Sequence, residues 1–78
     1  MGKMTNILKA ELNEKGFFPE KVTTYDRHFV ATWMINARSV ASHEMSERLA
    51  NAGYNVISSR ENWYGRPQFK IHFSKKGD

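Results

Sequence analysis

The N-terminal part of the chain carries apolar residues at helical spacing. These residues recur every three or four positions and therefore line one helix face; they are Met4, Ile7, Leu8 and Leu12. The pattern predicts a helix from about Thr5 to Lys15, with Thr5 as its N-cap. Gly16 supplies the left-handed residue that commonly ends helices, and Phe17 follows it where an apolar contact back onto the helix is expected.

A second amphipathic helix is predicted from Ser39 to Ala52. Its apolar stripe has the same spacing and consists of Ala41, Met45, Leu49 and Ala52, with Val40 beside it. Ser39 or Ser42 can cap the start of this helix. As in the first helix, a glycine followed by an aromatic residue, Gly53 and Tyr54, marks its end.

Four stretches rich in β-branched and aromatic residues are predicted to be strands: Lys21 to Tyr25, His28 to Ile35, Asn55 to Asn62 and Gln68 to Ser74. Asp26 and Arg27 form the first turn, and residues 63–67, with their glycine and proline, form the second. The second strand has apolar groups on both faces, which indicates a central position in the sheet. In the last strand, apolar and polar residues alternate between a core face and a wet face: Phe69, Ile71 and Phe73 against Lys70, His72 and Ser74.

The elements therefore read helix–strand–strand twice. The two helix ends, at Gly16 and Gly53, lie 37 positions apart, which indicates either an internal duplication or shared capping chemistry. The predicted fold class is α+β: an αββαββ two-layer sandwich with a four-stranded, mainly antiparallel sheet and two helices on one face. We expect one domain over residues 4–75, with residues 1–3 a vector-derived remnant before a natural start at Met4, and 76–78 a polar tail.

Composition narrows the class of protein further. The chain has 78 residues, which allows one small domain. It has no cysteine, so disulfides and cysteine-containing zinc sites are excluded. Apolar residues reach 40%, too many for a disordered chain, yet no apolar run is long enough to span a membrane. We expect a cytoplasmic protein without a cofactor, whose charge of +4 favours an acidic partner.

The C-terminal hairpin gathers the residue types that bind nucleic acids. Cations neutralise phosphates, and flat aromatic rings stack on bases. The residues expected to bind nucleic acid are Arg60, Trp63, Tyr64, Arg66, Lys70, His72 and Lys75, together with Arg38 before the second helix. Arg38 can form a phosphate-binding corner with Ser39 and Ser42. The alternative is that Trp63 and Tyr64 cap the core while the cations solvate an outer face.

Catalytic motifs are weak in this sequence. His43 and Glu44 begin a pattern similar to the H-E-x-x-H zinc helix, but Glu47 replaces the second histidine, so no metal site is expected. His28 and His72 with a nearby cation have the chemistry for acid–base cleavage of RNA, but nothing in their sequence spacing forces the two rings together. Nucleotide-binding glycine loops and nucleophile elbows are absent from the sequence. We therefore expect a protein that is not an enzyme.

The segment from Glu44 to Phe73 is loosely similar to small toxin-type RNA-binding folds. Those proteins carry a catalytic histidine in the first turn of the hairpin, whereas the corresponding residues 60–66 contain none. The resemblance therefore implies no role for any individual residue.

Two functions remain open from the sequence. The first is a small binding domain, a monomer or homodimer, that contacts RNA or DNA through the basic hairpin and an open sheet face. The second is a small phage- or mobile-element-type protein that binds and inhibits a host protein with an acidic surface. It would use an exposed strand edge or an aromatic patch around Phe18 and Met34.

Overall fold

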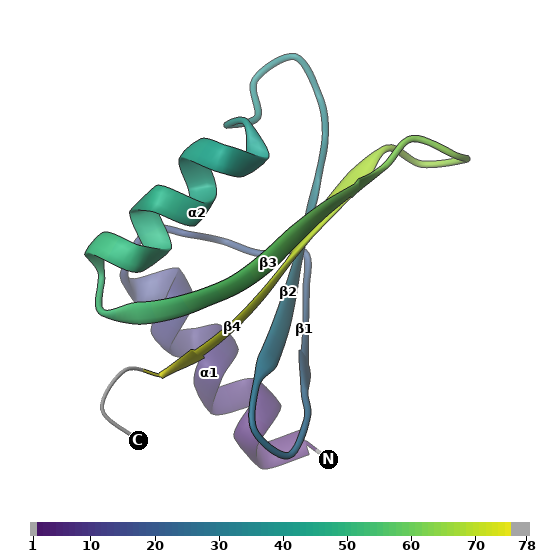
Figure 1. The fold of residues 1–78 in the computed structure, drawn as a ribbon. Helices are drawn as coiled ribbons and strands as arrows, with labels where there is room; N and C mark the ends of the chain where they lie inside the picture. The colour runs from purple at the N-terminus through teal and green to yellow at the C-terminus, as the bar shows by residue number, and fades with distance from the viewer. Residues whose placement is uncertain (1, 76–78) are drawn as a thin grey trace.

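The computed structural model describes residues 2–75 and contains two helices and four strands (Figure 1). In chain order the elements are α1 (Gly2–Glu14), β1 (Lys21–Thr24), β2 (Phe29–Met34), α2 (Ser42–Asn51), β3 (Tyr54–Asn62) and β4 (Gln68–Lys75). The strand limits differ from the predicted ones by one residue at most. The expected tail at 76–78 and Met1 lie outside the described residues.

The strands form one sheet in the order β1-β2-β4-β3, and each neighbouring pair is antiparallel. The predicted central position of the second strand is confirmed, because β2 pairs with β1 on one side and with β4 on the other. Both helices lie on the same side of the sheet (Figure 1). The predicted α+β fold with an αββαββ order is thus confirmed.

The core lies between the helices and one sheet face. Leu8 and Leu12 of α1 and Met45 and Leu49 of α2 meet side chains that alternate along the strands. The largest fully buried side chains are Leu12, Leu49, Phe69, Ile71 and Phe73. The predicted alternation in β4 is confirmed, since its three apolar residues are buried.

A Schellman motif ends α1 at the predicted glycine. Gly16 has φ +90°, its N–H donates to the Asn13 carbonyl (3.0 Å), and the Phe17 N–H donates to the Leu12 carbonyl (2.9 Å). Gly53, with φ +101°, ends the second helical segment, and its N–H donates to the Ala50 carbonyl (3.2 Å). Phe17 and Tyr54 are both buried, so each helix end delivers an aromatic ring to the core.

The starts of the helices differ from the prediction. Helix α1 begins at Gly2, so Thr5 lies inside it, and the Thr5 hydroxyl shares a hydrogen bond with the Thr24 hydroxyl of β1 (3.1 Å) instead of capping. Met4 and Ile7 of the predicted apolar stripe are exposed, whereas Leu8 and Leu12 are buried.

Helix α2 begins at Ser42, three residues later than expected, with Ala41 as an N-cap that makes no side-chain hydrogen bond. Neither serine caps the helix. Ser39 forms a turn with Asn36, whose N–H donates to the Ser39 hydroxyl at 2.7 Å, and the Ser42 hydroxyl donates to Glu61 of β3 at 2.8 Å. The Asn36 turn offers local hydrogen bonds that compete with helical ones.

Candidate functional site

No part of residues 2–75 covers the sheet face opposite the helices, and we call this face the open face. Its strand residues follow from the pairing register and from the alternation with the buried residues. They are Lys21 and Thr23 of β1; Val30, Thr32 and Met34 of β2; Gln68, Lys70, His72 and Ser74 of β4; and Asn55, Ser58, Arg60 and Asn62 of β3. At its centre, Val30 and Thr32 are 6% exposed, so longer open-face neighbours shield them.

A row of cations crosses the open face. Lys21 pairs with Thr32, Thr32 with Lys70, and Lys70 with Arg60, so three of four adjacent strand positions carry a positive charge. Like charges directly opposite one another on neighbouring strands are destabilising. An anion bound above the row would therefore reduce the repulsion among these cations.

A β-bulge is responsible for Arg60 being in this row. The register of β3 against β4 shifts between Val56 and Ser58, so Ile57 is the extra residue. Val56 packs against the core, and without the bulge strict alternation would turn Ser58 and Arg60 to that same side. The bulge instead turns Arg60 toward Lys70 and turns Glu61 toward Ser42 of α2.

Acidic residues are absent from the open face over residues 2–75. The helices carry four of the described carboxylates, and Glu61 faces α2. Glu20 precedes β1 and Asp26 lies in the β1–β2 turn. The open face thus carries cations and no described carboxylate, whereas the helices, the turn and the loops carry charges of both signs.

Three flat rings lie beside the cationic row. Tyr25 stacks on His28 with ring centroids 4.9 Å apart, and His28 stacks on His72 at 5.5 Å. The planes are tilted by only 11° and 24°. We call these three rings the ring ladder; it brings together the two histidines whose sequence spacing gave no reason to pair them.

A hollow of about 400 Å³ adjoins the ring ladder. It lies between β3 and β4 and is lined by Ser58, Ser59, Arg60, Lys70 and His72. The structure therefore brings together three of the residues predicted to bind nucleic acid: Arg60, Lys70 and His72.

Lys75 lies apart from this group, on the helix side of the sheet. Its Nζ forms an ion pair with Glu11 of α1 at 3.3 Å. The Glu11 carboxylate also accepts a hydrogen bond from the Tyr54 hydroxyl. This hydrogen bond lowers the pKa of Glu11 below its ordinary value, against the opposing effect of burial and with further help from Lys75. Burial, followed by the bond to Glu11, raises the pKa of Tyr54.

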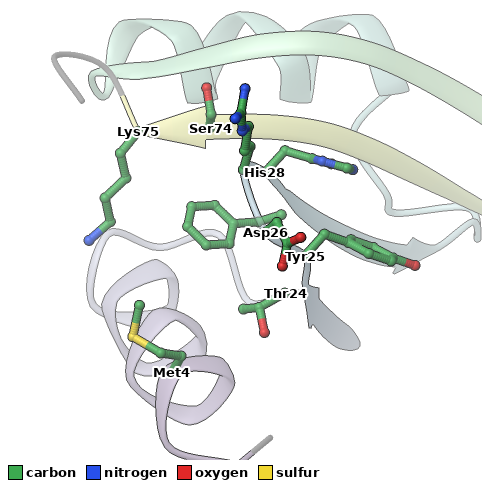
Figure 2. A pocket seen from close by; sticks show the side chains of 9 residues that line it. Met4, Thr24, Tyr25, Asp26, His28, Ser74 and Lys75 are labelled. Carbon is green, nitrogen blue, oxygen red and sulfur yellow. The ribbon is translucent and has the colours of Figure 1, made fainter.

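A second cavity, of about 550 Å³, lies at the end of the sheet near the start of α1 (Figure 2). Met4, Lys75 and the β1–β2 turn line it. Figure 2 shows the Lys75 side chain extending toward α1, away from Tyr25 and His28. Tyr25 and His28 of the ring ladder line this cavity as well, but it shares no lining residue with the hollow beside His72.

The tip of the β3–β4 hairpin holds the two aromatic residues that were predicted to stack on bases. Trp63 is 62% exposed and Tyr64 91% exposed, so neither caps the core. The Trp63 indole N–H donates to the Glu61 carboxylate (3.2 Å), and the Ser42 hydroxyl of α2 donates to the same carboxylate. Glu61 therefore connects the tip to α2. The hairpin extends away from the helices (Figure 1), and Arg66 is exposed at the same tip.

Arg38 and the expected aromatic patch lie elsewhere. Arg38 is exposed in the loop before α2, where its backbone N–H donates to the Asn36 side-chain carbonyl (2.9 Å). The serines expected to form a phosphate corner with Arg38 are engaged with Asn36 and Glu61. Phe18 is exposed with φ +51°, whereas Met34 is half-buried on the open face.

Sequence reasoning did not include Lys21, Tyr25 and His28 in the site. Lys21 and the two rings come from the N-terminal half of the chain, and only the antiparallel register brings them to His72 and Lys70. The strand alternation around His28 placed it on the same face as Val30, and this was the one local signal available.

Comparison of this chain with protein-family models, curated proteins and solved structures finds no match. Across residues 2–75, neither helix has the length and apolarity needed to cross a membrane. The same residues contain no grouping of three histidines and carboxylates suited to hold a metal ion.

Proposed function

We propose that this protein is a small non-enzymatic binding domain that binds nucleic acid through the open face. The observation that supports this most is the single sign of charge on the open face: Lys21, Lys70 and Arg60 stand in one row across the sheet, with no described carboxylate on that face. Phosphate contacts of this kind supply most of the sequence-independent affinity for nucleic acids.

The cations in this row are available to a ligand. The ion pairs among the described residues join Arg48 to Glu44 and Lys75 to Glu11, and neither involves the row. Lys70 and Arg60 also line the hollow, so a bound phosphate group would contact both side chains at once. An anion held there would remove the repulsion between the two cations, which adds to its binding free energy.

Titration of labelled RNA and DNA at several salt concentrations tests the proposal. Each phosphate contact contributes about 0.7–0.9 to the slope of log affinity against log salt. We expect Arg60→Ala and Lys70→Ala each to reduce that slope by about this amount and to weaken binding similarly across sequences. Lys9→Ala, which removes the same charge from the helix side, serves as the matched control and keeps the slope. Failure of the wild-type protein to bind any nucleic acid at low salt would refute the proposal.

A second candidate function rests on the hairpin tip. Trp63 and Tyr64 are large aromatic residues held out in solvent, and such residues dominate the energetics of protein–protein interfaces. In this case the protein inhibits or modulates a host protein with an acidic surface, and the open-face cations steer the encounter.

Affinity capture with and without nuclease treatment separates the two functions. A partner that survives nuclease, is lost with Trp63→Ala and is retained with Lys70→Ala supports the protein-binding function. Material that is lost on nuclease treatment and with Lys70→Ala supports nucleic-acid binding.

A further inference from the structure

We infer that the nucleic acid bound on the open face is single-stranded, with a backbone phosphate in the hollow beside His72 and a neighbouring base stacked on the ring ladder. This inference rests on the proposed nucleic-acid function and adds the class of substrate and the path of the strand. It follows from two features of the same face: a cationic hollow and a stack of parallel rings next to it.

The hollow has the chemistry of a phosphate site. The Arg60 guanidinium and the Lys70 ammonium provide charge-assisted donors, and the Ser58 hydroxyl and the His72 ring provide further donors. Ser58 pairs with His72 and Arg60 pairs with Lys70, so the four side chains form two adjacent cross-strand pairs around one opening. The volume of about 400 Å³ is large enough to accommodate a phosphodiester group.

The ring ladder provides a surface for bases. Tyr25, His28 and His72 are stacked nearly parallel, and Tyr25 at the outer end is 55% exposed. The stack can therefore be extended by a further flat ring at Tyr25. Stacking on aromatic side chains requires a base that is unpaired and free to leave its own stack, which favours a single strand over a duplex.

The positions of these features define a diagonal path. Tyr25 follows β1, His28 precedes β2, His72 lies in β4, and the hollow lies between β4 and β3. Neighbouring strands are about 4.8 Å apart, so the path crosses about 12 Å of sheet. Because His72 belongs to both the ladder and the hollow, a base on Tyr25 and a phosphate in the hollow are separated by the length of the ladder, which a segment of a few nucleotides spans.

Two sets of variants test the two features separately. Tyr25→Leu removes the outer ring and leaves every cation in place, whereas Tyr25→Phe keeps the ring. We expect Tyr25→Leu to weaken binding of a single-stranded oligonucleotide by about fivefold or more without changing the salt slope. Tyr25→Phe, which keeps the ring, should bind the oligonucleotide with the wild-type affinity. Duplex affinity should not respond to either variant.

Inorganic phosphate alone provides an independent probe of the hollow. In NMR titrations, phosphate should shift the ring resonances of His72 more than those of Tyr25, and Arg60→Ala should reduce that response. Equal or tighter binding of duplex than of single strands, or unchanged single-strand affinity of Tyr25→Leu, would overturn the inference while leaving the proposed function standing. If the protein bound no nucleic acid at all, both the inference and the proposed function would be refuted.

Discussion

Tyr54 joins the beginning of β3 to helix α1, and its replacement by phenylalanine tests how much this link stabilises the fold. The Tyr54 hydroxyl donates to the Glu11 carboxylate, and its ring packs edge-on against Phe73 with centroids 5.3 Å apart. Lys15 lies over the same ring, with its Nζ 5.0 Å from the centroid. Tyr54→Phe keeps the ring contacts and removes only the hydroxyl.

The expected magnitude follows from the type of hydrogen bond. A bond to a charged acceptor contributes about 1.5–3 kcal/mol to the free energy of unfolding. The lower end applies here, because the Glu11 side chain is 30% exposed and keeps its ion pair with Lys75 in the variant. We therefore expect Tyr54→Phe to cost about 1.5 kcal/mol at neutral pH. For a domain of this size that lowers the melting temperature by about 6–12 °C.

The pH dependence of stability provides a second signature. The pKa of Glu11 is lowered on folding, so its contribution is present above its ordinary value of 4.5 and is lost as pH falls through the folded value. The pKa of Tyr54 is raised, so its contribution is present below its ordinary value of 10.0 and is lost as pH rises above it. In Tyr54→Phe the alkaline loss should disappear and the acid loss should become smaller.

Thermal unfolding followed by circular dichroism over a pH series measures both effects. Tyr64→Phe is the matched control, since Tyr64 is 91% exposed and its loss of a hydroxyl should leave the melting temperature unchanged. The reasoning fails if Tyr54→Phe melts at the wild-type temperature, or if it keeps the wild-type loss of stability at alkaline pH.

Three further predictions concern single contacts. Trp33→Phe removes the indole N–H that donates to the buried Phe17 carbonyl (2.8 Å). The variant should lower the free energy of unfolding, measured by urea titration, by about 1–3 kcal/mol. An unchanged urea midpoint would contradict this. Gly53→Ala places a side chain on a residue with left-handed backbone (φ +101°) and should lower the free energy of unfolding by about 1–2 kcal/mol in the same titration. The control Ala50→Gly, on the exposed surface of α2, should lower it less. Lys75→Ala should leave the salt slope of nucleic-acid binding as in wild type, because Lys75 faces α1; a slope reduced as in Lys70→Ala would place it in the interface.

Local signals were sufficient to predict most of the fold. The alternation of Phe69, Ile71 and Phe73 with polar residues indicated which face of β4 is buried, and Gly16 followed by Phe17 predicted the Schellman motif. The predicted start of α1 was wrong, since α1 begins at Gly2. Thr5 bonds to Thr24, a residue 19 positions away, instead of capping the helix, and such a contact leaves no trace in the local sequence.

The candidate site was predictable only in part. Lys70 and His72 follow from strand alternation, and the same alternation puts Lys75 on the side of Phe73, a signal that grouping by proximity in sequence overlooked. The position of Arg60 depends on the bulge at Ile57, and the pairing of His28 with His72 depends on the β2–β4 register. Both are set by contacts between distant segments.

The order β1-β2-β4-β3 has a consequence for chain connectivity. If the two αββ halves exchange places, β1 takes the place of β3 and β2 that of β4. The strand order is then the same from the opposite edge of the sheet, with the β2–β4 pair at the centre. Helix α1 begins and β4 ends toward one end of the molecule, opposite the loop 35–41 that joins the halves (Figure 1), and Met4 and Lys75 line one cavity there. A circular permutant that opens the chain within 35–41 and joins the original ends through a short linker should therefore fold to the same sheet, with the ring ladder and the hollow assembled from the opposite chain order.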